Sequence, residues 1–148
     1  MGKINYGRVI IGGLLAGVIL TIGESILNLV VVQDQWQMFM EQRNLPAEST
    51  GMNIMWLLWN FVIGLALVLL YALIRPRCGP GAKTAAWTGV FVWFLVWFMC
   101  FGAIGLSFGM PSSLILTSLI WGLPEVVLAA LVGGWAYKEE VESGGQTN

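Results

Sequence analysis

Four long apolar stretches dominate the sequence and limit the folds open to it. They run from about residue 9 to 32, 52 to 74, 84 to 106 and 114 to 137. A helix needs about 20 mainly apolar residues to cross the hydrocarbon core of a bilayer, and each stretch reaches that length. We therefore predict one all-α domain over residues 1–138, a polytopic membrane protein with four transmembrane helices packed as an antiparallel four-helix bundle.

The composition supports a membrane environment. Hydrophobic residues make up 57% of the 148 residues, and charged residues make up 10%, whereas a soluble domain carries roughly 25% charged residues. The mean hydropathy is +0.79. A water-soluble globule of this length would need more charged side chains to cover its surface.

The basic residues predict the orientation of the chain. Six of the seven fall in segments that the four spans place on one side of the membrane: Lys3, Arg8, Arg75, Arg77, Lys83 and Lys138. Basic loops stay in the cytoplasm, so we predict that both termini are cytoplasmic and that residues 139–148 form a disordered, acidic cytoplasmic tail. Cys78 then lies in a reducing compartment, and we expect no disulfide with Cys100.

Two smaller elements are predicted outside the spans. The stretch from Gln35 to Arg43 is typical of a short interfacial helix, which would turn its apolar side chains toward lipid. These side chains are Trp36, Met38, Phe39 and Met40. Ser112 and Ser113 follow Pro111, and their hydroxyls are expected to cap the start of the fourth span.

Missing residue types exclude several kinds of function. The chain has no histidine, which removes the usual general base, the usual haem ligand and any Ser-His-Asp site. Two cysteines cannot build a four-thiolate zinc or iron–sulfur site. The net charge of -1 gives no basic surface for nucleic acid. We therefore expect no enzyme activity, no metal, no cofactor and no nucleic-acid partner.

Small and polar residues recur on one face of each predicted helix, because residues three, four and seven apart share a face. These stripes are Gly13, Gly17, Glu24 and Asn28; Asn53, Asn60, Gly64 and Tyr71; Ala85, Gly89, Cys100, Ala103 and Ser107; and Ser118, Gly122, Glu125, Ala129 and Ala136. Small residues let membrane helices approach closely, and packing alone would explain the glycines and alanines.

The third span also carries an aromatic face opposite its small residues. It consists of Trp87, Phe91, Phe94, Phe98 and Phe101. We expect this aromatic face to contact lipid, a second copy of the chain in a homodimer, or another membrane protein.

Glu24 and Glu125 are the only charged side chains within the spans. At about 1.5 Å of rise per residue, Glu125 lies near the bilayer midplane and Glu24 about 5 Å to its external side. Asn60 falls at a similar depth, and Asn28 lies one turn further out. These four residues form the candidate polar core, a predicted ion or proton site, with Cys100 in the same layer.

No lysine or arginine lies within a span, and an unpaired ionised carboxylate is costly in hydrocarbon. Three arrangements remain open. Each acid is protonated and hydrogen-bonded; the two acids share one proton; or a water-filled cavity hydrates them and admits a cation. A purely structural network, in which neutral acids clamp the helices together, is the alternative to all functional roles.

Gly122 and Pro124 predict a kink in the fourth span. Proline lacks an N–H and leaves the carbonyl of Ile120 without its helical bond, next to Glu125. Such a kink binds ions or waters in some membrane proteins and is purely structural in others.

Several short motifs resemble a family of small bacterial four-span integral membrane proteins that has no established activity. The motifs are Asn5-x-x-Arg8-Val9, Gly23-Glu24 with Leu27-Asn28, Arg75-Pro76-Arg77 with Gly79-Pro80-Gly81-x-Lys83-Thr84, and Trp121-Gly122-Leu123 with Glu125-Val126. They span most of the chain. The resemblance implies a bacterial inner (cytoplasmic) membrane location and no catalytic role.

Three functions fit these observations. The first is a non-enzymatic bundle that is an accessory or subunit of a membrane assembly. The second is a small transporter or channel for protons or a small cation that uses Glu24 and Glu125. The third is a protein that binds an amphiphile, such as a quinone, isoprenoid or lipid. Its groove would be lined by Trp56, Trp59, Trp93, Trp97 and Trp121.

Overall fold

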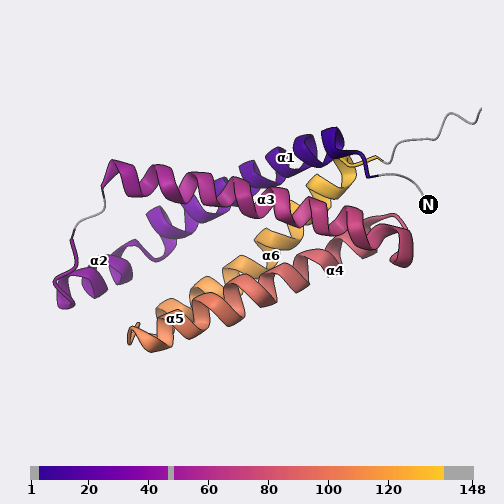
Figure 1. Ribbon diagram of the computed structural model, residues 1–148. Helices are drawn as coiled ribbons and strands as arrows, with labels where there is room; N and C mark the ends of the chain where they lie inside the picture. The colour runs from indigo at the N-terminus through magenta and orange to yellow at the C-terminus, as the bar shows by residue number, and fades with distance from the viewer. Residues whose placement is uncertain (1–3, 47–48, 139–148) are drawn as a thin grey trace, which may run out of the picture.

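The computed structural model describes residues 4–46 and 49–138, and every regular element in these two ranges is a helix (Figure 1). The elements are α1 (Tyr6–Ile26), η1 (Leu27–Val31), α2 (Gln33–Gln42), α3 (Thr50–Cys78), α4 (Ala82–Trp93), η2 (Phe94–Phe101), α5 (Gly102–Ser107) and α6 (Ser112–Ala136). Here η marks a π-helical segment. The predicted tail at 139–148 lies outside the described residues.

Four continuous helices are long and apolar enough to cross a membrane: Tyr6–Val31, Thr50–Cys78, Ala82–Ser107 and Ser112–Ala136. The four predicted spans are thus confirmed as helices, with ends that differ by up to four residues. The largest difference is at the end of α3, which continues through Arg75 and stops at Gly79. The φ of Gly79 is 84°, a conformation that glycine adopts without strain and that ends helices.

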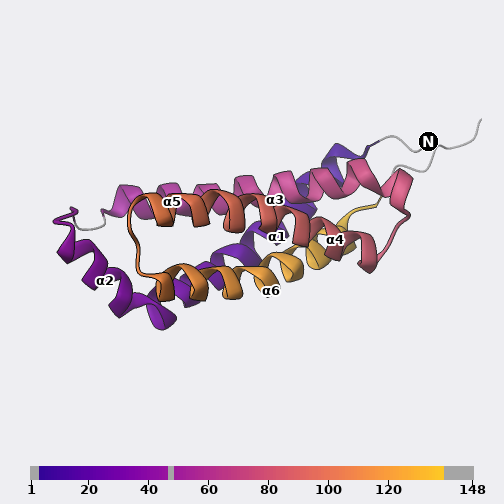
Figure 2. The same cartoon turned by 90° about the horizontal axis from the view of Figure 1, so that it is seen from below.

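Glycines bring the backbones of α1, α3 and α6 together. A Cβ on Gly64 of α3 would lie 2.5 Å from the carbonyl oxygen of Gly13 and 2.6 Å from the backbone nitrogen of Gly17. A Cβ on Gly12 of α1 would lie 2.6 Å from the carbonyl oxygen of Gly133 in α6. α4 packs mainly on α6, beside which it lies in Figure 2.

The third helix departs from the predicted stripe because part of it is π-helical. Gly89 is buried as predicted, but Cys100, Ala103 and Ser107 are exposed, so the predicted stripe is wrong beyond Gly89. The buried positions after Gly89 in η2 and its flanks include Val92, Trp97 and Gly102, which are five residues apart. A π-helix hydrogen-bonds from i to i+5, and it therefore brings Trp97 to the interior and turns Cys100 outward.

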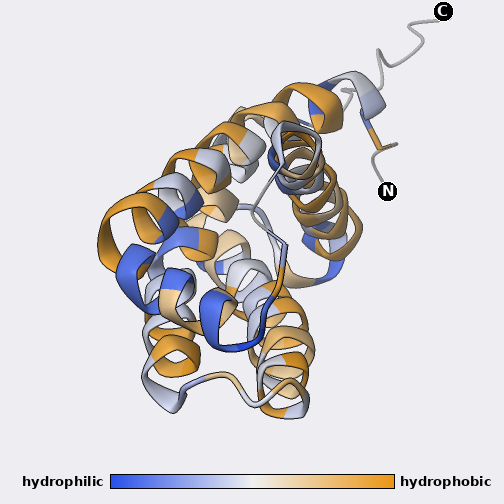
Figure 3. Cartoon of the chain, turned by 90° about the vertical axis from the view of Figure 1, so that its left-hand side faces the viewer, coloured by the Kyte–Doolittle hydropathy of each residue, from blue (hydrophilic) through white to orange (hydrophobic). Residues whose placement is uncertain are grey.

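The short helix α2 confirms the predicted element but not its lipid contacts. α2 lies across one end of the bundle, where its ribbon is largely hydrophilic (Figures 1 and 3). Met38 is exposed, but Phe39 is buried. Trp36 packs on the apolar cluster of Leu27, Val32 and Leu114. The prediction that Phe39 faces lipid is wrong, because its ring is buried.

Ser113 joins α2 to α6 and does not cap α6 as predicted. Its hydroxyl donates to Oε1 of Gln35 at 3.1 Å. α6 begins at Ser112 without a side-chain cap. Another hydroxyl does cap a helix: Oγ of Ser49 accepts from the backbone N–H of Met52 at the start of α3.

Candidate functional site

Glu125 lies inside the bundle, on the face of α6 that also carries Ser118, Gly122 and Ala129. Its side chain is only 7% exposed. The carboxyl group occupies the space beside Gly23 of α1, where a Cβ would lie 2.5 Å from the carboxyl carbon and 2.7 Å from Oε1. The absence of a side chain at residue 23 therefore makes room for this acid. The predicted small stripe of the fourth span is buried throughout.

Neither carboxyl oxygen of Glu125 has a partner with hydrogen-bond geometry among the described residues, although the backbone N–H of Glu24 lies nearby. Glu24 is close enough that the two carboxylates would repel each other if both were ionised. A buried polar group is normally hydrogen-bonded, and leaving a carboxyl group without partners costs free energy. Glu125 is therefore the residue whose position packing alone explains least.

Glu24, in contrast, accepts hydrogen bonds at both carboxyl oxygens. Nδ2 of Asn28 donates to Oε2 at 3.0 Å and also to the Glu24 backbone oxygen at 2.8 Å. Nε1 of Trp97 donates to Oε1 at 3.3 Å. Helices η2, α1 and α6 thus meet at the two acids, since Trp97 also packs against Gly122 of α6, where a Cβ would lie 2.5 Å from Cδ1 of Trp97.

Two further indole N–H groups donate hydrogen bonds near this site. Nε1 of Trp121 donates to the carbonyl oxygen of Gly23 at 3.2 Å, and Nε1 of Trp93 donates to the carbonyl oxygen of Leu119 at 3.0 Å. Trp97 could not be assigned to the acids from the residue pattern, because uniform α-helical periodicity puts this residue off the polar face. Only the π-helical turn of η2 brings it there.

Asn60 does not share the depth predicted for it. Its neighbour Phe61 packs against Gly17 of α1, and Gly17 is seven residues before Glu24, or about 10 Å along the helix axis. The Asn60 side chain is half-buried. Of the four predicted polar residues, the structure therefore brings Glu24, Asn28 and Glu125 together and leaves Asn60 apart.

The two predicted kink residues have different surroundings. α6 is helical from Ser112 to Ala136 without a break at Pro124, whose side chain is exposed. Gly122 is buried and makes room for Trp97. A kink that frees the Ile120 carbonyl stays a prediction, while a packing role of Gly122 beside the acids is observed.

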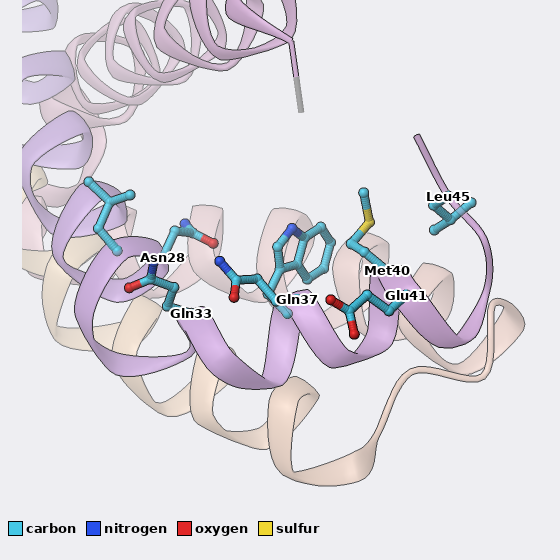
Figure 4. A pocket seen from close by; sticks show the side chains of 8 residues that line it. Asn28, Gln33, Gln37, Met40, Glu41 and Leu45 are labelled. Atoms are coloured by element: carbon cyan, nitrogen blue, oxygen red, sulfur yellow. The ribbon is translucent and has the colours of Figure 1, made fainter. Parts of the chain in front are cut away.

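A groove lies immediately beyond Asn28, between η1 and α2 (Figure 4). Its volume is about 360 Å³. The polar lining residues are Asn28, Gln33, Gln37 and Glu41, and the apolar ones are Leu29, Trp36, Met40 and Leu45. Because Asn28 both lines this groove and donates to Glu24, the groove ends next to the two acids.

The site combines two carboxyl groups with N–H donors. Among the described residues, no three histidine, cysteine or acidic side chains lie close enough to hold a metal. The two acids offer carboxyl oxygens, while Asn28 and Trp97 offer only N–H donors to Glu24.

Comparisons with protein-family models, curated proteins and solved structures gave no match for this chain.

Proposed function

We propose that this protein is a small integral membrane transporter in which Glu24 and Glu125 bind a proton and pass it across the bilayer. A small cation that competes with the proton would use the same two acids. The observation that carries this proposal is the buried carboxyl group of Glu125, which has no hydrogen-bond partner among the described residues and lies beside a second acid. Ionisable residues inside membranes mark ion and proton pathways.

The charges around the two acids support proton binding. The membrane-crossing helices carry lysine and arginine only within three residues of their ends, at Arg8, Arg75, Arg77 and Lys83. Glu24 and Glu125 lie well inside these helices, so no basic side chain lies at their depth. Two adjacent carboxyl groups cannot both be ionised at low cost in a medium of low dielectric constant, and such pairs share a proton. The pair that holds one shared proton carries one negative charge, and a second proton taken up from one side of the membrane makes it neutral. Loss of that second proton to the other side constitutes the transport step.

The proposed topology is an antiparallel bundle in a bacterial inner membrane with both termini in the cytoplasm. The start of α1, the α3–α4 turn and the end of α6 lie at the end of the molecule opposite α2 (Figures 1 and 2). Arg8, Arg75, Arg77, Lys83 and Lys138 belong to these segments. The positive-inside rule favours this orientation, which puts α2 and the groove on the external side. The resemblance to bacterial four-span proteins favours the bacterial inner membrane as the location.

The second candidate function is that of an accessory or subunit in a membrane assembly. It is favoured by the aromatic face of α4 and η2, where Trp87, Phe91 and Phe98 are each at least half exposed. The rings of Phe94 and Phe98 stack at 5.3 Å. Lipid would cover this aromatic face equally well. A homodimer through it is compatible with transport, since four helices offer little room for a pathway alone.

Binding of an amphiphile by the five tryptophans is less well supported. Trp56 and Trp59 are 59% and 54% exposed on α3. Trp93, Trp97 and Trp121 use their N–H groups inside the bundle. These rings therefore belong to different environments and do not line one groove.

Proton flux into proteoliposomes tests the proposed function. Purified protein is reconstituted with a trapped pH-sensitive dye, potassium and valinomycin, and the external medium is acidified. Wild-type protein should acidify the lumen faster than protein-free vesicles. The variant Asp34→Asn, which changes an exposed acid on α2 outside the site, should match wild type. Lumen acidification at the protein-free rate, with protein present in the vesicles, would contradict the proposal.

A further inference from the structure

The groove beside Asn28 combines one acid with apolar and amide side chains. Glu41 is the only ionisable residue among its lining residues, and no lysine or arginine lines it. Leu29, Met40 and Leu45 give the groove an apolar wall, and Trp36 adds an aromatic ring. Figure 4 shows Gln37 and Glu41 on α2 and Asn28 on the preceding segment of the chain.

The basic residue nearest to Glu41 in the sequence is Arg43, just after α2, and its side chain is directed elsewhere. Nη2 of Arg43 donates to the carbonyl oxygen of Gly109 at 3.4 Å, in the loop between α5 and α6. The Arg43 guanidinium also lies over the ring of Phe39, 5.8 Å from its centroid. No ion pair with Glu41 occurs within the described residues. The negative charge of Glu41 is therefore not neutralised by the arginine two residues away.

We propose that this groove binds an amphipathic organic cation, with a single positive charge near Glu41 and an apolar body against Leu29, Met40 and Leu45. Each part of such a ligand has a matching group in the groove. The carboxylate attracts the charge, an aromatic ring favours a cation over a neutral group, and the apolar wall buries hydrocarbon. A volume of about 360 Å³ falls in the range of small-molecule sites.

The groove also explains how such a cation would act on the two acids. Asn28 links the groove to the acids, since its side chain lines the groove and its amide donates to Glu24. A cation bound in the groove would be separated from Glu24 by the Asn28 amide alone, so its charge would compete with the proton on the two acids. In this respect the inference rests on the proposed function and names its substrate class, although binding in the groove does not itself require transport.

Equilibrium dialysis with labelled tetraphenylphosphonium tests the binding. Detergent-purified wild-type protein should retain the cation above a protein-free micelle blank. Glu41→Gln should weaken binding about fivefold, the size expected for losing one exposed charge interaction. Asp34→Asn is the matched control on the same helix and should bind as wild type does. Tetraphenylborate, which has the same shape and the opposite charge, should not exceed its own micelle blank.

Equal binding of tetraphenylphosphonium by wild type and Glu41→Gln would overturn the inference, as would retention of tetraphenylborate to the same extent. The outcome is separable from that of the transport proposal. Binding that depends on Glu41, without proton flux in proteoliposomes, would leave the groove as a cation site and remove the transport function. Proton flux without such binding would support the transport function and remove the cation site in the groove.

Discussion

Replacing Glu125 by glutamine should reduce proton flux in proteoliposomes to the rate of protein-free vesicles while the bundle remains folded. Glutamine has nearly the shape of a protonated glutamic acid and fits beside Gly23, but its amide does not release a proton at any accessible pH. The loss should therefore be complete rather than partial. The measurement is the initial rate of dye acidification at equal protein content, with folding checked by circular dichroism and by elution in detergent.

The variant Glu125→Leu separates the transport role from a structural one. It should lose flux as completely as Glu125→Gln, yet its free energy of unfolding should equal or exceed that of wild type. Both Glu125 oxygens lack a partner among the described residues, and removing a buried polar group without partners is neutral or stabilising. A large loss of stability in Glu125→Leu, together with full flux in Glu125→Gln, would indicate that Glu125 clamps the helices and carries no proton.

Replacing Gly64 by alanine should lower the free energy of unfolding by about 2–3 kcal/mol, near the upper end of what overpacking usually costs. All three atoms nearest to the new Cβ belong to the backbone of α1, in Gly13 and Gly17, at 2.5 to 3.0 Å. A side chain can rotate away from a contact of this kind, but a helix backbone must move as a whole. α1 and α3 would separate and lose contacts along their length. Reversible unfolding in mixed detergent micelles measures the change.

Gly51→Ala is the matched control, because Gly51 lies in the same helix with only Oγ of Ser49 near its added Cβ, at 3.9 Å. Alanine there should leave the stability unchanged or raise it by up to about 1 kcal/mol through its higher helix propensity. If Gly64→Ala were as stable as Gly51→Ala, α1 and α3 would not be in backbone contact.

The fold was largely predictable because hydropathy and length determine membrane helices strongly. Apolar runs of sufficient length have few alternatives in a bilayer, since every backbone polar group must be satisfied within the helix. The residues at which the helices end were less predictable. α3 continues through Arg75 and Arg77 to Cys78, because a helix need not stop where the apolar residues stop.

The candidate site was predictable only in part. Glu24, Asn28 and Glu125 stand out because polar residues are rare within spans, and the structure brings these three residues together. The predicted depth of Asn60 was wrong because it followed only from the position of this residue within its own span. The contact of Phe61 with Gly17 sets how α3 lies along α1. Trp97 was missed as a partner of Glu24 because the π-helical turn of η2 changes the periodicity. No residue type in η2 predicts such a turn.

Infrared difference spectroscopy tests the central claim, that Glu24 and Glu125 share a proton inside the membrane, most directly. A protonated carboxyl group has a carbonyl stretching band that a carboxylate lacks. Spectra of wild-type protein at neutral pH, subtracted from those of Glu125→Gln and of Glu24→Gln, should show one such band that is present in wild type and altered or lost in each variant. Wild-type spectra without a protonated-carboxyl band, or a band that neither substitution changes, would contradict the shared proton.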